Sequence, residues 1–348
     1  MNHFFVDASI RPYTISFKRP LSFGPVKHNF KKGHFLVLRD NFSNIVMGEL
    51  PFLEGLHSGD PGKNLEILEK ISLDILNKEI DLKNLNFRKN AFNLFPIDQE
   101  GLPLFCIEGA LLSWLEKVDR KQVNNFFQGN SKNPVGVPVN GLLIPTQKED
   151  PKELVENWKR KGFKTIKIKI GNLPINEELN LIWGIFKEAK NSLKIRLDGN
   201  QKFSGEDFFF FAKNLPVEFV DYIEDPIKDI KLLEKIHEET KLSFAFEESL
   251  IKGNFKKEKY LKAWIIKPSI FGGLSKSIQI IDKAHDQGLI AVISSAYESK
   301  MGLKQLTSLA TYQNRFQKTD CGLNTFDNFI DDDSLENPKL EKGILSFS

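Results

Sequence analysis

The sequence has 348 residues but contains little cysteine and no long apolar run. Its two cysteines, Cys106 and Cys321, offer no metal-binding spacing and no disulfide framework, so a reduced, cytoplasmic setting is expected. No stretch approaches the roughly 18 uninterrupted apolar residues of a membrane span. The first residues lack a basic segment followed by an apolar one, as a secretory signal would have. The absences predict a protein with neither a membrane span nor a secretory signal.

Charge of one sign is also scarce, because 49 basic and 46 acidic residues leave a net charge of only +3. A nucleic-acid partner usually requires a concentrated basic face. The short basic runs, such as Lys256 and Lys257, are interrupted by acids. Hydrophobic residues make up 41% and charged residues 27%, which is ordinary for a soluble globular protein. We therefore expect no nucleic-acid or membrane partner, and a homo-oligomer stays open.

The first third of the chain has strand patterns followed by helical patterns, which is typical of an α+β unit. The three β-rich runs and two helical stretches lie at 6–17, 34–38, 44–50, 64–77 and 105–118. A polar segment at 124–134 suits a domain boundary. The sequence thus predicts an α+β capping domain over 1–125, completed by the C-terminal tail, 331–348, packing back on it.

From residue 137 onwards, short β-rich runs alternate with helical runs. The strand runs are 137–144, 165–170, 193–197, 220–224, 243–246, 263–266 and 289–294, and the helical runs between them include 151–161, 175–189, 229–238 and 274–287. Such alternation indicates a parallel sheet, and a further strand near Thr319 favours closure into a barrel. A doubly wound sheet would need a glycine cluster after its first strand, which 139–142 does not supply. We predict a modified TIM barrel, (β/α)7β, over 135–330.

Two of the predicted barrel strands carry charged residues on one face. In 165–170 the isoleucines alternate with Lys167 and Lys169, and in 193–198 the apolar residues alternate with Arg196 and Asp198. Either strand alone would favour a sheet with one wet face. In a barrel the helices cover the outer, apolar face, so the charged face points into the lumen. Charges enclosed there must pair with one another or bind a metal.

Carboxylates end three successive strands, at Asp198, Glu224 and Glu247. Catalytic residues of such barrels lie at the C-terminal strand ends. Three converging carboxylates repel one another unless a cation binds, and all-oxygen ligation suits Mg²⁺, for which Mn²⁺ can substitute. Glu248 is an alternative third ligand, although strand alternation should point its side chain the other way.

Lys267 ends the next strand, four strands away from the strand of Lys167 and Lys169, so the lysines should face each other across the barrel mouth. A lysine acts as a general base only if its pKa falls, which nearby cations and burial would favour. A metal bound to a carboxylate substrate would stabilise the enediolate formed when the α-proton leaves. This predicts proton abstraction beside the carboxylate of a small molecule, followed by elimination, racemisation or cycloisomerisation.

Five motifs in this order resemble the muconate-lactonising subgroup of the enolase superfamily, over most of the chain. They are Lys-Ile-Lys at 167–169, Asp-Gly-Asn at 198–200, Glu-Asp-Pro at 224–226, Glu-Glu-Ser at 247–249 and Lys-Pro at 267–268. The third metal ligand in that subgroup is commonly Asp, whereas Glu247 stands here, one methylene longer. The resemblance implies Asp198, Glu224 and Glu247 as the metal ligands.

Within the subgroup, the segments 138–142, 294–299 and 322–325 and the residue Arg196 are most similar to the o-succinylbenzoate synthases. That resemblance implies Mg²⁺-dependent dehydration of 2-succinyl-6-hydroxy-2,4-cyclohexadiene-1-carboxylate, a step of menaquinone biosynthesis. Lys169 would remove the α-proton and help expel the hydroxyl, Lys267 would lie over the other face, and Lys167 would stay charged near the substrate carboxylate. The expected substrate contacts are Asn140, Arg196, Asn200, Ser294, Ser295, Gly322 and Leu323.

The same residues also bear on other activities of the superfamily. Mandelate racemases carry a His on the seventh strand, but 291–295 has none, and His285 lies in the preceding helical run. Dipeptide epimerases carry Asp-x-Asp at the last strand, where 321–324 reads Cys-Gly-Leu-Asn. Racemisation of N-succinylamino acids stays open because the same two lysines could perform it, as does a barrel that only binds a ligand. Cap loops at 21–24 and 52–55 either close over the mouth or are ordinary turns.

Overall fold

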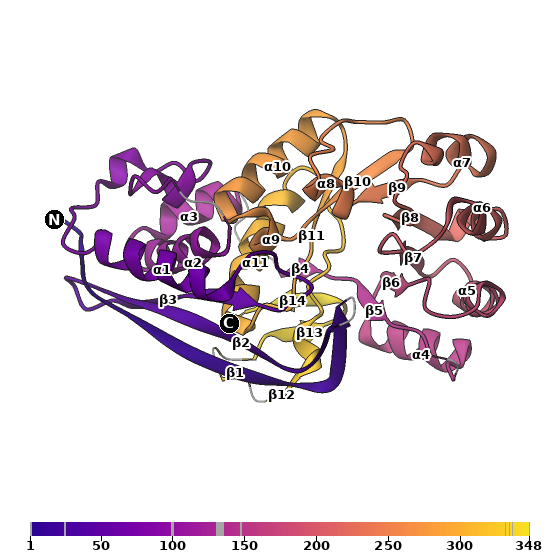
Figure 1. Cartoon of the computed structure of the whole chain (residues 1–348), viewed down its shortest axis with the longest axis horizontal. Coiled ribbons are helices and arrows are strands. Elements are labelled where there is room, and N and C mark those ends of the chain that lie inside the picture. The colour runs from indigo at the N-terminus through magenta and orange to yellow at the C-terminus, as the bar shows by residue number, and fades with distance from the viewer. Residues whose placement is uncertain are drawn as a thin grey trace.

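The computed structural model describes residues 2–23, 26–98, 101–129, 136–146, 148–330, 332–333, 335 and 337–347. An N-terminal antiparallel sheet with its helices lies beside a curled parallel sheet whose helices cover the outside (Figure 1). Among these residues, no helix has both the length and the apolar character needed to cross a membrane. The architecture agrees with the predicted capping unit and modified TIM barrel.

The cap sheet is built from three long antiparallel strands, β1 (Phe5–Phe23), β2 (Val26–Asp40) and β3 (Ile45–Phe52). A short strand from the far end of the chain, β12 (Phe329–Ile330), pairs with β1. Helices α1 (Pro61–Asp74), α2 (Leu102–Val118) and α3 (Arg120–Phe127) follow, with short 3₁₀ turns at Leu82–Asn84 and Asn90–Asn93. The predicted strands and helices are all present, and the strands are longer than the β-rich runs indicated.

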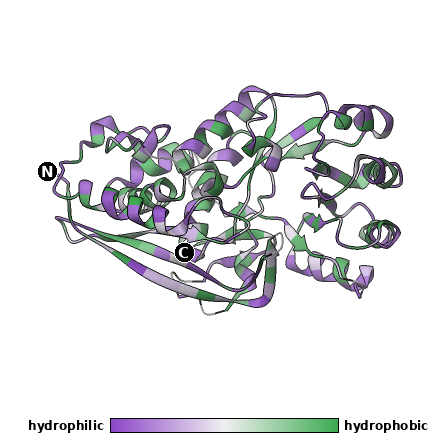
Figure 2. Ribbon diagram, in the orientation of Figure 1, coloured by the Kyte–Doolittle hydropathy of each residue, from purple (hydrophilic) through white to green (hydrophobic). Residues whose placement is uncertain are grey.

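Helix α2 is buried over most of its length because it packs against β3. A Cβ atom at Gly48 of β3 would lie 1.9 Å from the carbonyl oxygen of Cys106, so only glycine allows this approach. The helix is apolar on nearly all sides, as expected for one enclosed in a protein core. By contrast, Figure 2 shows hydrophilic and hydrophobic stretches mixed on the barrel's outer helices, each of which buries one face.

Seven parallel strands form the barrel sheet in sequence order. They are β5 (Gly141–Leu143), β6 (Thr165–Lys169), β7 (Lys194–Asp198), β8 (Val220–Glu224), β9 (Phe244–Phe246), β10 (Leu261–Ile266) and β11 (Ile290–Ile293). Single parallel bridges join Val139 to Cys321 and Ser294 to Gly322, so residues 321–322 stand between the last strand and the first. This short eighth element, close to the expected Thr319, completes the (β/α)7β pattern.

The helices lie between the strands in the chain and outside them in space (Figure 1). They are α4 (Pro151–Lys161), α5 (Ile175–Ala189), α6 (Gly205–Lys213), α7 (Leu232–Thr240), α8 (Glu248–Ile251), α9 (Pro268–Phe271), α10 (Leu274–Asp286) and α11 (Lys300–Asn314), with 3₁₀ turns at Val217–Phe219 and Phe326–Asn328. The four predicted helices are confirmed, whereas the sequence analysis did not identify α6 or α11.

A small apolar cluster fills the middle of the barrel. It consists of Tyr222, Ala245, Ala263, Ile265 and Val292, all buried and separate from the main core. Alternation places these side chains on the inner strand faces. The lumen is therefore a packed layer that supports the charged residues at the strand ends.

Two expectations about the chain between and after the domains need correction. Residues 120–127 form α3, so the segment expected to be a loop at 124–134 begins as a helix, and 130–135 lies outside the described residues. The tail strands β13 (Lys339–Glu341) and β14 (Ile344–Ser346) pair with β4 (Val137–Pro138), next to the first barrel strand, and not with the cap. Pairing there satisfies the free edge of β4 and fully buries Leu345.

Candidate active site

The register of the barrel strands brings Lys169, Asp198 and Glu224 to the same level, with Lys167 two residues before Lys169 on the same strand face. Lys169 is paired with Asp198 across β6 and β7, and Asp198 with Glu224 across β7 and β8. Glu247 and Lys267 come directly after β9 and β10. The structure thus gathers all six residues at the C-terminal strand ends, where such barrels carry their chemistry.

The three lysines are each bonded to the carboxylates. Lys167 Nζ lies 2.7 Å from Asp198 Oδ2 and 2.9 Å from both Glu224 oxygens. Lys169 Nζ lies 2.6 Å from Asp198 Oδ2, and Lys267 Nζ donates to Glu247 Oε1. The Lys169 side chain is the most exposed of the three at 26%, against 10% for each of the others. Lys169 is therefore the lysine that best reaches an approaching molecule.

The charges of the cluster shift one another's pKa values. Burial raises the pKa of Glu224 well above its usual range, and Asp198 adds to this, although Lys167 opposes it. For Asp198 burial is outweighed by Lys167 and Lys169, so its pKa is lowered. Burial also favours neutral Lys267, but Glu247 outweighs it and raises the pKa. The carboxylates likewise outweigh burial at Lys167 and raise its pKa. The expected fall in lysine pKa depends on a bound cation and stays a prediction.

The donor set fits a hard divalent cation, even though the described residues include no three acidic, His or Cys side chains already arranged around one point. The carboxylates turn instead toward different lysines. Glu247 Oε2 is buried with no hydrogen-bond partner, and Glu224 is held near two other acids that raise its pKa. A bound cation would satisfy the orphaned oxygen and relieve the repulsion. Asp198, Glu224 and Glu247 are the residues that could hold it.

Asp225 fixes the backbone that carries Glu247, and the sequence analysis did not assign it a role. Its carboxylate accepts hydrogen bonds from the amide of Glu247 and from the hydroxyl of Ser249. Asp225 has a positive φ of 32°. The Glu-Asp-Pro and Glu-Glu-Ser motifs contain these residues, so the motifs also encode the support between the strand ends.

Two predicted substrate contacts have other partners. The guanidinium of Arg196 lies 3.0 Å from Asp221 and donates to Thr319 and to the carbonyl of Asp320. Although Arg196 is paired with Lys167 across β6 and β7, its guanidinium bonds to these partners instead of to the carboxylates of the lysine cluster. Leu323 is fully buried in the main core.

The other predicted contacts surround the seam where the barrel closes. Asn140 is buried and donates to the carbonyl of Gly141, and Ser295 donates to Glu298. A Cβ at Gly322 would lie 2.6 Å from Ser294 Oγ, which requires glycine at this approach. Asn200, in contrast, belongs to the cluster itself, because Lys169 Nζ lies 2.7 Å from its Oδ1.

A series of hydrogen bonds joins the cap to the segments that follow the sixth and seventh barrel strands. His57, in the loop after β3, lies 3.2 Å from Ser269 Oγ, and Ser269 donates to Glu298. Burial, together with the nearby charges of Lys31 and Lys267, lowers the pKa of His57 to about 3. A neutral His57 therefore holds this cap loop over the sixth strand end. No sequence pattern indicates a contact between these two residues, which are 212 positions apart.

Residues of the cap near the ends of β1 and β3 also contact the barrel. Leu21 and Leu53 are buried in one apolar cluster against which Tyr297 of the barrel packs. These residues come from the two predicted cap loops, of which Gly24 lies outside the described residues. Lys31, fully buried, lies 2.5 Å from Glu49 and 2.6 Å from the carbonyl of Tyr297. Buried polar and apolar contacts thus join the cap to the loop after β11.

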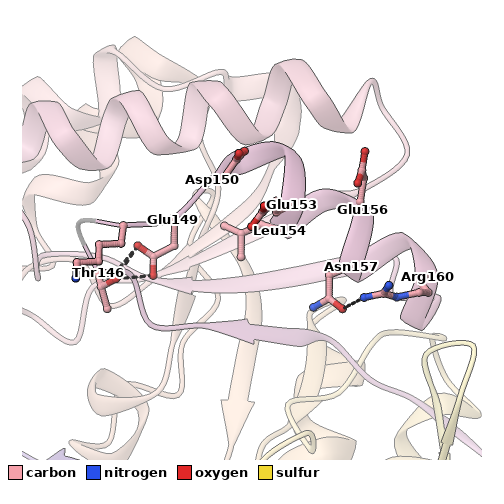
Figure 3. Close-up of a pocket in the computed structure, with 9 residues that line it drawn as sticks. Thr146, Glu149, Asp150, Glu153, Leu154, Glu156, Asn157 and Arg160 are labelled. Carbon is pink, nitrogen blue, oxygen red and sulfur yellow. Dashed lines mark hydrogen bonds between the residues drawn. The ribbon is translucent and has the colours of Figure 1, made fainter.

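A pocket of about 540 Å³ lies elsewhere, along α4 and the loop before it (Figure 3). Four acids line it, at Glu149, Asp150, Glu153 and Glu156. Glu149 accepts hydrogen bonds from Thr146, and Arg160 donates to Asn157. None of the lining residues belongs to the lysine–carboxylate cluster. We interpret it as a solvated helix surface.

Comparison with known proteins places this arrangement in a family. A family model described as "Enolase C-terminal domain-like" matches residues 150–347, more than half of the chain. The chain belongs to the enolase superfamily, in its mandelate racemase and muconate-lactonising subgroup. The o-succinylbenzoate synthase of Haemophilus influenzae is 35% identical over 184 residues, which cover 51% of this chain and 55% of that protein. The chain therefore spans about half the length of the curated relatives that it matches.

Solved structures of the superfamily resemble the whole chain. A muconate lactonizing enzyme from Pseudomonas fluorescens, complexed with muconolactone, has a TM-score of 0.81 at 16% identity and covers 99% of this chain and 94% of that one. A dipeptide epimerase from Enterococcus faecalis V583, complexed with Mg and L-Leu-L-Tyr, has a TM-score of 0.76 at 18% identity, with 99% and 97% covered. At these identities the likeness establishes the fold alone.

Proposed function

We propose that this chain catalyses the Mg²⁺-dependent dehydration of 2-succinyl-6-hydroxy-2,4-cyclohexadiene-1-carboxylate to o-succinylbenzoate. One observation carries the proposal: Lys169 and Lys267 bond to different members of a single carboxylate cluster, Asp198 and Glu247. An acid–base group on each side of a bound carboxylate is what α-proton chemistry requires. The identity to o-succinylbenzoate synthases supports this reaction among those of the superfamily.

Asp198, Glu224 and Glu247 would hold the cation. When bound, the cation supplies positive charge where the substrate carboxylate gains negative charge as the α-proton leaves. Mg²⁺ suits this all-oxygen set, and the Enterococcus epimerase, whose fold is similar, was solved with Mg.

Lys169 performs both proton transfers in this proposal, and the other two lysines supply positive charge. Lys169 takes the α-proton, and the electrons of the broken C–H bond form a carbon–carbon double bond as the ring hydroxyl leaves. The same amine returns its proton to the departing hydroxyl, so that water is released and the ring becomes aromatic. Lys267 holds its positive charge over the opposite face, while Lys167, bonded to Asp198 and Glu224, keeps its charge near the substrate carboxylate.

Racemisation of N-succinylamino acids is the second candidate. It is favoured by the same pair of lysines, since one can remove a proton and the other can return it to the opposite face. Dipeptide epimerisation has less support, because 321–324 lacks an Asp-x-Asp and Leu323 is buried in the core.

A turnover assay with purified protein and Mg²⁺ tests the proposal. We expect the cyclohexadiene substrate to be converted to o-succinylbenzoate, with a higher kcat/KM than for racemisation of an N-succinylamino acid. Racemisation without dehydration would replace the proposal by the second candidate. Ligand affinity without turnover would identify a binding barrel. Genes of menaquinone biosynthesis beside the coding gene would support the biological role.

A further inference from the structure

Lys169 lies at the start of a hydrogen-bonded chain that leads away from the carboxylate cluster. Its Nζ lies 2.7 Å from Asn200 Oδ1, and Asn200 Nδ2 lies 2.9 Å from Glu248 Oε1. Asn200 follows β7, and Glu248 begins α8. Both residues lie next to members of the proposed cation-binding set, and Glu248, whose Oε2 is also buried without a hydrogen-bond partner, is the alternative third ligand.

The hydrogen bonds from Lys169 through Asn200 to Glu248 are consistent with only one orientation of the Asn200 amide. An amide has one acceptor side and one donor side, and a lysine ammonium can only donate. Glu248 accepts the amide's N–H, so the amide oxygen must face Lys169. The backbone of Asn200 is fixed as well, because its φ is 44° and its N–H lies 3.2 Å from Asp198 Oδ1. Glu248 thus determines which end of the Asn200 amide the lysine meets.

The Asn200 amide gives Lys169 a second hydrogen-bond acceptor besides Asp198. Its other acceptor is Asp198, at 2.6 Å, and a lysine held by that carboxylate alone would turn toward the cation-binding set. The amide oxygen of Asn200 offers a second acceptor on the other side. The amine is therefore held between two groups, and a long flexible side chain is kept in one place.

We propose that Asn200 and Glu248 are positioning residues that hold the amine of Lys169 at the point where it takes the substrate proton. The inference rests on the proposed function. It replaces the expectation that Asn200 binds substrate directly, and it explains why Glu248 is present beside Glu247.

Steady-state kinetics of Asn200→Leu and Glu248→Leu test this assignment. Each variant should lower kcat by about 10- to 100-fold, the range expected for loss of one hydrogen bond to a charged group, with KM and Mg²⁺ affinity little changed. Glu248→Gln should retain most of the activity, because its amide oxygen still accepts from Asn200. The double leucine variant should be no slower than Asn200→Leu, since both residues act on Lys169 through the same series of hydrogen bonds.

The kinetic isotope effect with α-deuterated substrate separates positioning from a merely structural role. A misplaced amine makes proton abstraction slower, so the isotope effect should rise in both leucine variants. Gln201→Leu is the matched control: it is the adjacent residue, also has a positive φ, and its side chain accepts from Lys252. This control should leave kcat and the isotope effect unchanged.

Unchanged kcat in either leucine variant would overturn the proposal, as would a raised KM with unchanged kcat, which would make Asn200 a substrate ligand. If the wild type does not dehydrate the cyclohexadiene substrate, the proposed function fails. The positioning role of Asn200 and Glu248 is then tested by the rate at which acetic anhydride acetylates Lys169. Loss of the Asn200 acceptor should speed that acetylation several-fold, measured by peptide mass spectrometry. An unchanged acetylation rate in Glu248→Leu and Asn200→Leu would overturn it.

Discussion

Lys267 and Glu247 form a buried ion pair between the ends of two neighbouring strands, β10 and β9. The pair occupies one oxygen of Glu247 and leaves the other buried without a hydrogen-bond partner. On the other side of the cluster, Lys169 and Asp198 form the corresponding pair. The two pairs place an amine on each side of Glu224, and the predictions below follow from this arrangement.

Removal of the divalent cation should abolish activity. Treatment with EDTA followed by desalting should leave an inactive protein, and Mg²⁺ or Mn²⁺ should restore turnover. Glu247→Gln should weaken Mg²⁺ binding by more than about tenfold, since even neighbours of metal ligands commonly change affinity by that much. Isothermal titration calorimetry measures the affinity. Full activity in metal-free protein would contradict the assigned ligand set.

The buried pair Lys31–Glu49 should contribute strongly to stability. Both side chains are fully buried, and Glu49 also accepts from Ser299 of the barrel. Glu49→Gln should lower the unfolding free energy by about 3–5 kcal/mol, because it leaves an uncompensated buried charge on Lys31.

The matched control for that pair is Lys213–Glu239, whose side chains are 47% and 36% exposed. Glu239→Gln should change the unfolding free energy by less than about 1 kcal/mol, as is usual for exposed ion pairs. Urea denaturation followed by circular dichroism measures both variants. Equal effects would show that the cap–barrel network adds no stability.

Acidification should destabilise the wild type through His57. Its pKa falls from an ordinary 6.5 to about 3 in the folded protein, so the unfolded state binds the proton more tightly. No cost arises above pH 6.5, and the cost grows as pH falls from there toward 3. At pH 5 it should reach about 2 kcal/mol relative to His57→Gln. Unfolding free energies of both proteins at pH 8 and pH 5 check this. A constant difference between them would contradict a buried, neutral imidazole.

The lysines and carboxylates of the site could be predicted from sequence because the signals are local. Strand alternation assigned Lys167, Lys169 and Asp198 to the inner face, and unit spacing placed Glu224 and Glu247 at neighbouring strand ends. Alternation also assigned Arg196 to the inner face, but it gives no information on which partners a side chain meets there. The guanidinium of Arg196 bonds to Asp221 and Thr319, and its contact with substrate stays a prediction.

Contacts between distant parts of the chain could not be predicted in this way. The bond between Lys31 and the carbonyl of Tyr297 spans 266 residues, and no periodic pattern encodes it. The sequence also did not show which side chains pair within the site. The amide of Asn200 bonds to Lys169 and Glu248, and its expected contact with substrate stays a prediction. Partner choice depends on the packed geometry and on competing acceptors.

The most direct test is the dehydration rate of Lys169→Ala and Lys267→Ala in saturating Mg²⁺, with circular dichroism to show that each variant is folded. Loss of the general base in Lys169→Ala should lower kcat by about 10²- to 10⁴-fold. Loss of the positive charge in Lys267→Ala should lower it by about 10²- to 10³-fold. We expect kcat to drop at least that much in each variant, while the wild type converts the cyclohexadiene substrate to o-succinylbenzoate. Near-normal kcat in either variant would contradict the two-lysine account.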